Sequence, residues 1–153
     1  MEAGGQKRLQ ITGIHHVTLI CASLERSAPF YRDVLGLRIV EETVNEDDPT
    51  ARHFFFGDAA GAPGTVVSLI EYPQMEEARV GRGGTHHLAL SVESAEELEG
   101  WRAWLGSQGV QATEVLDRTY FHSIYLRDPD GHIIEIATRG PGFGPRVESS
   151  QLA

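Results

Sequence analysis

The sequence predicts one α+β domain made of two βαβββ modules, which form a single curved mixed sheet around a metal site. The chain has 153 residues, the length of one ordinary domain, and 41% of them are hydrophobic, which is enough to build a core. It repeats itself once, in two separate segments. Two histidines and one glutamate occupy positions of this repeat at which they can serve as metal ligands.

The repeat consists of two pairs of matching segments that occur in the same order. Residues 13–19 match residues 84–90, and residues 64–70 match residues 131–137. The offset is 71 residues in the first pair (13 to 84) and 67 in the second (64 to 131), which indicates a small length change in the loops between them. One match can arise by chance, but two in the same order indicate a duplicated module.

Each module is expected to begin with a short strand that leads into a helix. The strands are residues 14–20 and 85–92, both rich in residues that favour β-structure. Ser23 can cap the first helix, and Ser94 with Glu97 forms a capping box at the start of the second. The apolar stripes that define the two helices are Leu24, Phe30, Tyr31, Val34 and Leu35 in the first and Leu98, Trp101 and Leu105 in the second.

Three further strands complete each module. Gly36 and Gly109 mark the predicted ends of the helices. The sequence Asp-Pro-Asp-Gly at residues 128–131 predicts a turn between the last two strands. The predicted strands are residues 37–42, 52–56 and 65–71 in the first module and residues 110–116, 120–126 and 132–138 in the second.

These elements set the domain boundaries. The single domain covers residues 13–138, with its modules at residues 13–72 and 84–138. Residues 1–12 are expected to form a flexible N-terminal segment. Residues 139–153 are rich in glycine and proline and are expected to form a tail without regular structure.

The charge of the chain argues against nucleic acid as a partner. The net charge is −9 at pH 7, and the basic residues are scattered rather than grouped with aromatic side chains.

No segment has the ~18–20 consecutive apolar residues of a membrane helix, and residues 1–10 lack the apolar run of a signal peptide. The one cysteine, Cys21, excludes a disulfide within the chain and fits a reducing compartment. The sequence therefore predicts a cytoplasmic protein.

Strand alternation places one histidine of each module on the inner face of the sheet. Successive strand residues point to opposite faces. The face that contains His86 is otherwise apolar and should pack on the helices. His87, and by symmetry His16, then point into the hollow of the sheet. The opposite parity would select His86 and His15 instead.

Glu135 supplies the third candidate ligand. It lies in an otherwise apolar strand, where a carboxylate is costly unless it is paired or bound to a metal. Two imidazoles and one carboxylate form the facial triad of non-haem Fe(II) oxygenases, and the same set can hold catalytic zinc. In the first module, Ser68 occupies the repeat position that is equivalent to Glu135, and serine is a poor ligand for such a metal. The alternative for each histidine is a hydrogen-bonded core residue without a metal.

The same residues give the chain a resemblance to a known family. It resembles the vicinal oxygen chelate superfamily (glyoxalases, bleomycin resistance proteins and dioxygenases), and within it most closely the ring-cleaving dioxygenases that open hydroquinones and chlorohydroquinones. The resemblance covers about residues 13–143 and implies the glyoxalase/dioxygenase fold. The stretches that carry it are residues 14–19, 34–38, 43–45, 47–49 and 62–65 in the first half and residues 117–118, 120–121, 123–125, 135–138 and 141–143 in the second.

The resemblance implies roles for five residues. His16, His87 and Glu135 match the iron ligands of those dioxygenases, and Arg118 and Tyr125 match residues that orient and polarise the aromatic substrate. Chemically, Tyr125 can donate or accept a proton, and Arg118 can stabilise developing negative charge. Without such roles Tyr125 is an interior tyrosine and Arg118 a surface ion-pair partner. Those dioxygenases are typically about twice as long, with two such domains.

We therefore expect a metal-dependent enzyme, a non-haem Fe(II) dioxygenase that cleaves a catechol or hydroquinone ring with dioxygen. Zn, Mn and Ni are the alternative metals. One alternative function is a glyoxalase-like lyase or isomerase, which usually has a fourth protein ligand, so Ser68 argues against it. The other is a drug-sequestering binding protein, which needs no metal triad. The superfamily also implies a homodimer, which fits the need to cover sheet edges.

Overall fold

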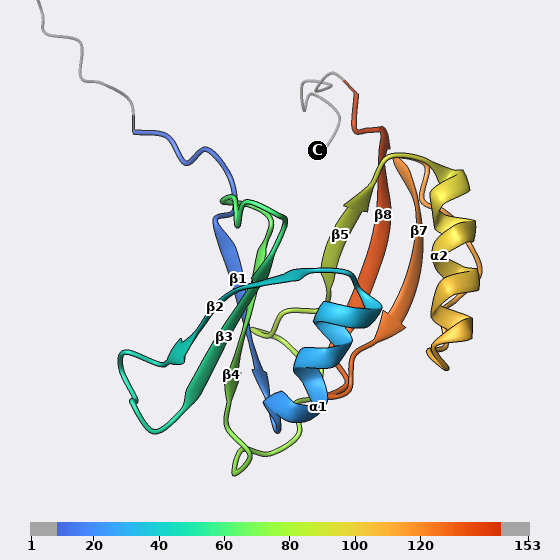
Figure 1. Ribbon diagram of the computed structural model, residues 1–153. Helices are drawn as coiled ribbons and strands as arrows, with labels where there is room; N and C mark the ends of the chain where they lie inside the picture. Colours follow the sequence, from blue (N-terminus) through green and yellow to red (C-terminus); the bar gives the residue numbers. More distant parts are fainter. Residues whose placement is uncertain (1–8, 145–153) are drawn as a thin grey trace, which may run out of the picture. The chain divides into compact units, whose positions relative to one another are not determined.

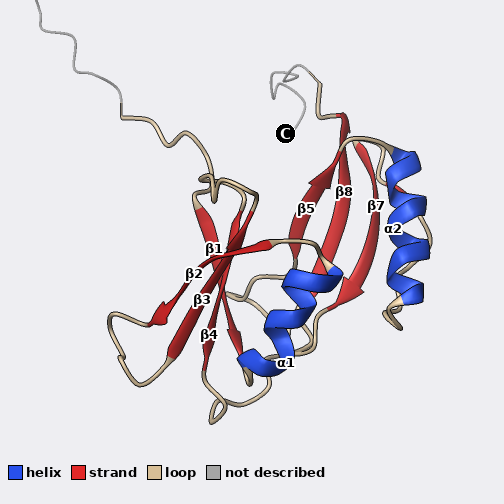
Figure 2. Ribbon diagram, in the orientation of Figure 1, coloured by secondary structure: helices blue, strands red, loops and turns tan. Residues whose placement is uncertain are grey.

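The computed structural model describes residues 9–144, which divide into two compact units. Among the described residues, the first unit consists of residues 9–24 and 31–73, and the second of residues 25–30 and 74–144. Each unit contains one four-stranded sheet of mixed strand direction. The labelled strands of each unit can be followed in Figures 1 and 2. The predicted α+β fold of two modules is confirmed. The expectation of one curved sheet is wrong for the described residues: the strand pairs hydrogen-bond only within each module, so each module forms a sheet of its own.

The first sheet contains β1 (His16–Cys21), β4 (Val66–Glu71), β3 (Arg52–Gly57) and β2 (Arg38–Val44), in that spatial order. β1 is parallel to β4, whereas the other neighbours are antiparallel. The core of this unit includes Phe56, Leu69 and Tyr31, none of which has measurable exposure. The rings of Tyr31 and Phe56 pack with their centroids 5.6 Å apart. Burial of these large side chains holds the sheet against the segment that follows the first helix.

The second sheet repeats the arrangement of the first. It contains β5 (Leu88–Val92), β8 (Ile133–Pro141), β7 (Phe121–Arg127) and β6 (Leu116–Asp117), in that spatial order. In the first sheet Val17 pairs with Val67, and in the second Leu88 pairs with Ile134. These pairs differ by the same offsets as the sequence repeat, so the backbone register confirms the duplication.

Helix α2 (Ala95–Ser107) forms as the capping pattern predicts. The Ser94 hydroxyl accepts a hydrogen bond from the Glu97 backbone N–H at 3.3 Å, and the Glu97 carboxylate accepts one from the Glu93 N–H at 3.3 Å. Leu98 and Leu105 are fully buried. The helix packs on β7 and β8, so one face of the second sheet is covered by α2 (Figure 2).

Helix α1 (Leu24–Pro29) is followed by a π-helical turn, η1 (Phe30–Val34). Pro29 has no N–H to donate at the point where the geometry changes. Two side chains of α1 bind the carboxylate of Asp130, Ser27 Oγ at 2.6 Å and Arg26 Nη2 at 2.5 Å. Asp130 belongs to the predicted turn at residues 128–131, which closes through a hydrogen bond from the Gly131 N–H to the Asp128 carbonyl. This turn therefore anchors α1 within the second unit.

The prediction of a strand at residues 110–116 is wrong for most of its length. Only Leu116–Asp117 is a strand. Before it, the Thr113 N–H donates to the Tyr125 carbonyl at 3.0 Å, and the Thr113 carbonyl accepts from Arg102 Nε of α2 at 3.0 Å. The segment therefore divides its hydrogen bonds between β7 and α2 and does not continue the sheet ladder.

β8 is longer than the sequence pattern predicts. It continues through Pro141, which pairs with Phe121, so the expectation of an irregular chain from residue 139 is wrong for residues 139–141. Most of the predicted flexible segment at residues 1–12 and the last part of the predicted tail lie outside the described residues. Cys21 is 1% exposed and belongs to the core.

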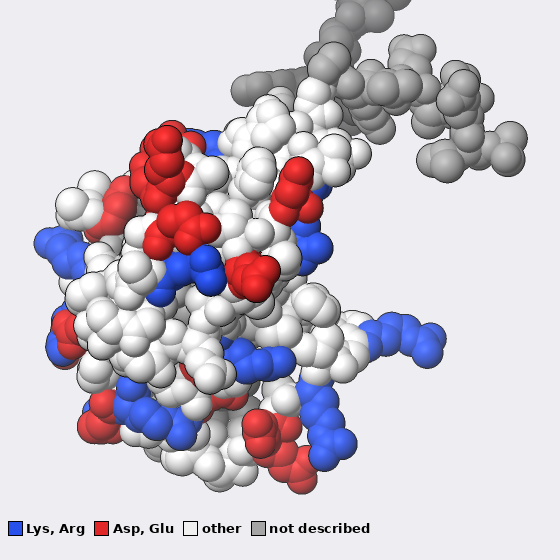
Figure 3. All heavy atoms as spheres, turned by 90° about the vertical axis from the view of Figure 1, so that its right-hand side faces the viewer, with Lys and Arg blue, Asp and Glu red and all other residues white. Residues whose placement is uncertain are grey.

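The surface shows no separation of charge on the face in Figure 3. Acidic and basic side chains are interspersed there. Within residues 9–144, none of the helices has both the length and the apolar character needed to cross a membrane.

Candidate metal centre

His87 and Glu135 form the centre of the candidate site in the second unit. Glu135 lies on β8 and is 2% exposed, and His87 directly precedes β5, the strand parallel to β8. His87 Nε2 lies 2.8 Å from Glu135 Oε2. Two ligand atoms that each bind an ion at about 2.0–2.2 Å, at roughly right angles, are about 3 Å apart. The spacing therefore suits two ligands of one metal ion.

Tyr125 binds the other oxygen of the buried carboxylate. The β7–β8 register places Tyr125 opposite Glu135, and its hydroxyl donates a hydrogen bond to Glu135 Oε1 at 2.8 Å. The Tyr125 ring stands edge-on to the His87 ring, with centroids 5.8 Å apart and planes at 86°. Because each oxygen of Glu135 has a polar neighbour, the burial of this carboxylate is compensated and its orientation is defined.

Arg118 adds a positive charge beside Tyr125. Its Cζ atom lies 5.2 Å from the centroid of the Tyr125 ring, a distance typical of a cation–π contact. A tight turn holds its backbone: the Arg118 N–H donates to the Phe121 carbonyl, and Thr119 has a φ of 70°. The guanidinium forms no ion pair with an acidic side chain in residues 9–144. Its charge is thus available to an anionic ligand.

His86 contacts the ring of His87, a relationship that parity alone did not predict. Its Nδ1 lies 2.9 Å from His87 Nδ1, and both rings are within reach of solvent. A ligand histidine commonly uses its second ring nitrogen in a hydrogen bond that fixes the tautomer and the ring orientation. With Nδ1 engaged in this way, His87 directs Nε2 towards Glu135. The signal for this pair is the doubled histidine itself, which occurs in both modules.

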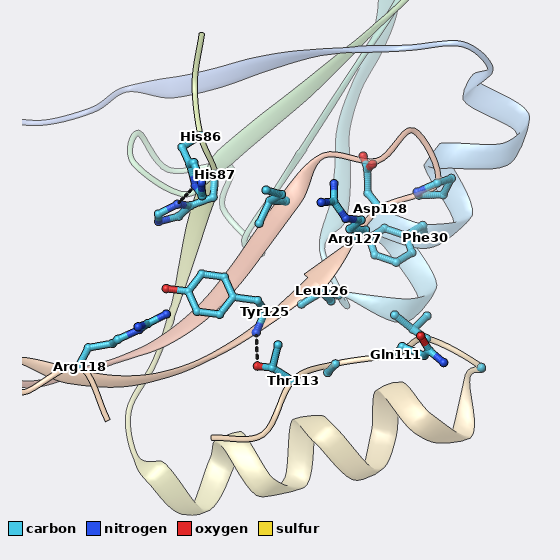
Figure 4. Close-up of a pocket in the computed structure, with 15 residues that line it drawn as sticks. Phe30, His86, His87, Gln111, Thr113, Arg118, Tyr125, Leu126, Arg127 and Asp128 are labelled. Carbon is cyan, nitrogen blue, oxygen red and sulfur yellow. Dashed lines mark hydrogen bonds between the residues drawn. The ribbon is translucent and has the colours of Figure 1, made fainter. Parts of the chain in front are cut away.

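A pocket of about 970 Å³ opens beside these residues within the second unit. Figure 4 shows His86 and His87 on one side of it, Tyr125 and Arg118 below them, and Phe30 at the far end. The Tyr125 N–H donates to the Thr113 hydroxyl at 3.1 Å, which ties the irregular segment after α2 to the pocket wall. The volume lies within the range of natural small-molecule sites.

The first unit carries His16 in the equivalent position. His16 begins β1, and its Nδ1 lies 3.0 Å from His15 Nδ1, which repeats the geometry of the second unit. The His16 ring lies 6.5 Å, between centroids, from the ring of Phe55. Phe55 pairs with Ser68 as Tyr125 pairs with Glu135, so the first unit has a phenyl ring where the second has a phenol.

Ser68 takes the place of Glu135 in the first unit. Its hydroxyl is fully buried and lies 2.8 Å from the hydroxyl of Thr18. The two hydroxyls satisfy each other, and neither is a strong ligand for a divalent ion. The first unit therefore offers an imidazole, His16, without an acidic ligand at this position.

His53 also lies on this part of the first sheet. Its ring packs on Phe55 with centroids 4.1 Å apart, and its buried Nε2 has no hydrogen-bond partner among residues 9–144. Burial, and secondarily the charge of His16, lowers the pKa of His53. The sequence alone suggests that His53 is a surface residue or a neighbour of the metal ligands, and the structure places it half-buried against Phe55.

The structure brings together two of the three predicted ligands, His87 and Glu135, and adds Tyr125 and Arg118 around them. His16 belongs to the other unit. Within either unit, the described residues contain no group of three or more His, Cys, Asp or Glu side chains arranged to bind a metal. The second unit therefore supplies a two-ligand pair, and the role of His16 as third ligand stays a prediction.

Comparisons with known proteins identify the family of the chain. The model of the Glyoxalase/Bleomycin resistance protein/Dioxygenase superfamily matches residues 13–136. The Bacillus subtilis protein named "Putative ring-cleaving dioxygenase MhqA" is 30% identical over 146 residues, which are 94% of this chain and 46% of that protein. The chain thus spans less than half the length of this relative.

Two further matches concern a shorter relative and a solved structure. The metallothiol transferase FosB of Staphylococcus haemolyticus is 32% identical over 130 residues, which are 84% of each protein. The crystal structure described as a "putative dioxygenase" from Bacillus subtilis superposes with a TM-score of 0.77 and 32% identity, covering 84% of this chain and 41% of that one. Both MhqA and FosB carry the name of an enzyme, and the name of FosB, metallothiol transferase, refers to a metal.

Proposed function

The chain belongs to the glyoxalase/bleomycin resistance protein/dioxygenase superfamily, and we propose that it is an Fe(II)-dependent dioxygenase that cleaves a dihydroxylated aromatic ring of the catechol or hydroquinone type. The observation that carries the proposal is the contact of 2.8 Å between His87 and the buried Glu135, with Tyr125 and Arg118 beside it. The name of the relative MhqA supports the same chemistry.

We assign the metal to His16, His87 and Glu135. The donor set fits a divalent ion, because each histidine engages Nδ1 with its neighbouring histidine and keeps Nε2 for coordination. The Glu135 carboxylate is buried and held in one orientation. Two imidazoles and one carboxylate leave open positions for a substrate and dioxygen, and this set is typical of non-haem Fe(II) oxygenases. Zn, Mn and Ni are the alternatives that metal analysis must exclude.

When bound, Fe(II) would acidify a coordinated ring hydroxyl and carry electrons between the ring and dioxygen. The protein residues would orient the ring and handle its protons. Tyr125 can hold a proton on its hydroxyl, 2.8 Å from Glu135 Oε1, and exchange it with the substrate. Arg118 would stabilise the negative charge of a phenolate near the Tyr125 ring.

Metal analysis of anaerobically purified protein, followed by oxygen-uptake assays with hydroquinone and catechol, tests this proposal. Bound iron together with oxygen uptake is the expected result. Glu135→Gln should lose both metal and uptake, whereas the exposed Glu114→Gln should keep both. Stoichiometric zinc or nickel without uptake would overturn the proposal, and so would full iron binding by Glu135→Gln.

A second candidate is a metal-dependent thiol transferase. It is favoured by the match to FosB, which covers 84% of both chains and so involves a relative of similar length. The Mn(II)-loaded protein would then consume a low-molecular-weight thiol in the presence of an electrophilic substrate, without oxygen uptake. Measuring thiol loss and oxygen uptake on the same preparation separates the two functions.

We also propose that the protein is a homodimer, as the superfamily implies. In the described residues, the edge strands β1 and β2 of the first sheet and β5 and β6 of the second have a sheet neighbour on one side only. Light scattering after gel filtration should give twice the mass of the chain. A monomer over the whole accessible concentration range would contradict this.

Cytoplasmic location also stays a prediction, which cell fractionation can test.

A further inference from the structure

The pocket of the second unit extends beyond the contact between His87 and Glu135. It has a volume of about 970 Å³, and its wall continues along β7 from Tyr125 to Arg127. Figure 4 shows His87 and Tyr125 towards one end and Arg127 with Phe30 towards the other. A ligand that uses the whole pocket therefore reaches from the proposed metal ligands to Arg127.

Arg127 lies two residues along β7 from Tyr125, the residue that pairs with Glu135. Side chains two residues apart on a strand share a face and are about 7 Å apart along it. Arg127 therefore shares the face of Tyr125, and its partner in the register, Ile133, shares the face of Glu135. This separation is comparable to the length of one aromatic ring that carries a small substituent.

The guanidinium of Arg127 is fixed in place but keeps most of its donors. Its Nη1 donates to the Gly131 carbonyl at 2.7 Å, which uses one of the five N–H donors of the group. Arg127 forms no ion pair with a carboxylate within residues 9–144, in contrast to five other arginines of the chain that do. Together with Arg118, it gives the pocket two guanidinium groups without carboxylate partners in the described part of the chain.

The acidic side chains at the pocket are already engaged. Asp128 is 6% exposed, and its Oδ1 accepts hydrogen bonds from the backbone N–H groups of Asp130 and His132 at 2.9 and 2.8 Å. Glu135 is in contact with Tyr125 and His87. The charge that remains available to a ligand in this pocket is therefore positive, although the chain has a net charge of −9.

We propose that the substrate is a dihydroxylated aromatic acid and that Arg127 binds its carboxylate. This inference rests on the proposed function, because the ring hydroxyls must lie at His87 and Glu135. Arginine recognises carboxylates through parallel N–H donors, which fix the orientation of a planar ligand. The apolar side chains of Phe30 and Ile133 line the same pocket and can contact the ring. Arg127 is thus a specificity-determining residue that selects an acid over an uncharged hydroquinone.

Equilibrium binding to the Fe(II)-loaded protein under anaerobic conditions tests the inference without turnover. The probes are 2,5-dihydroxybenzoate and 1,4-dihydroxybenzene, which differ by one carboxylate. Wild-type protein should bind the acid at least about tenfold more tightly, as expected of a charge-assisted hydrogen bond. Arg127→Gln should abolish this preference by weakening the binding of 2,5-dihydroxybenzoate alone. Arg127→Lys, which retains the positive charge, should keep part of the preference.

Arg82→Gln is the matched control, because it removes the same charge from an exposed position outside the pocket. It should bind both probes as wild type does. Equal affinity of wild type for the two probes would overturn the inference, and so would equal weakening of both probes by Arg127→Gln. These results differ from failure of the proposed function, in which the wild-type protein would not retain iron or Glu135→Gln would not release it.

Discussion

The hydroxyl of Tyr125 donates a hydrogen bond of 2.8 Å to Oε1 of Glu135, directly across the β7–β8 register. The other carboxylate oxygen, Oε2, lies 2.8 Å from His87 Nε2. The buried carboxylate of Glu135 therefore connects the proposed acid–base group, Tyr125, with the other proposed metal ligand of this unit, His87.

Replacing Tyr125 by phenylalanine should lower turnover more than it lowers metal affinity. The variant removes a group that can exchange protons with the substrate, an effect of about 10²–10⁴-fold on the rate. It also leaves Glu135 Oε1 without its donor, which costs about 1–3 kcal/mol of stability. Steady-state oxygen uptake and a metal titration measure the two effects. Tyr120→Phe, at a 46% exposed position, should change neither, and wild-type turnover of Tyr125→Phe would exclude the acid–base role.

Replacing His86 by alanine should weaken metal binding, although His86 is not a proposed ligand. Loss of its contact with His87 Nδ1 leaves the tautomer and orientation of that ring less defined, an effect of about 10–100-fold on affinity. Competition titration with Mn(II) against a chromophoric chelator measures the change. His122→Ala, outside the pocket lining, is the control. If His86→Ala retains wild-type affinity, its contact with His87 does not orient the ligand.

Phe56→Ala should destabilise the first unit strongly. Phe56 is fully buried on β3 and packs on Tyr31, so its truncation leaves a cavity and costs about 3–5 kcal/mol. Urea unfolding followed by circular dichroism measures the free energy of unfolding. The control Val80→Ala, at a 57% exposed position, should change it by less than about 0.5 kcal/mol. A small effect of Phe56→Ala would mean that the core closes around the missing ring.

Asp58 should contribute to stability in a pH-dependent way. Hydrogen bonds from backbone N–H groups, that of Ala62 foremost and that of Ala60 among the others, lower the pKa of Asp58 from its ordinary value of 3.8. A carboxyl with a lowered pKa in the folded state stabilises the protein above its unfolded pKa, and this contribution disappears as the pH falls through the lowered value.

Asp58→Asn should therefore be less stable than wild type near neutral pH, and the difference should shrink in strong acid. Urea unfolding across the acidic range measures this difference. Asp47→Asn, which changes a charge at another exposed position, should not show the same convergence. A difference that is constant with pH would show that the hydrogen bonds, rather than the charge, make the contribution.

Much of the fold is encoded in local patterns and is therefore readable from the sequence. The repeat offsets predicted which strands are equivalent, and the register of Val17 with Val67 and of Leu88 with Ile134 confirms them. The capping box at Ser94 predicted the start of α2. Glu135 was identifiable because a carboxylate among apolar strand residues requires a compensating partner, a requirement independent of the rest of the fold.

Other features depend on partners far away in the sequence, and only the tertiary structure decided them. Thr113 divides its hydrogen bonds between β7 and Arg102 of α2, so a segment with a strand-like pattern leaves the sheet. Ser27 of α1 binds Asp130, and all of α1 after Leu24 belongs to the second unit. Alternation along a strand states which face a side chain occupies. It does not predict which side chains from other elements lie beside it, and those neighbours determine what a buried carboxylate such as Glu135 can bind.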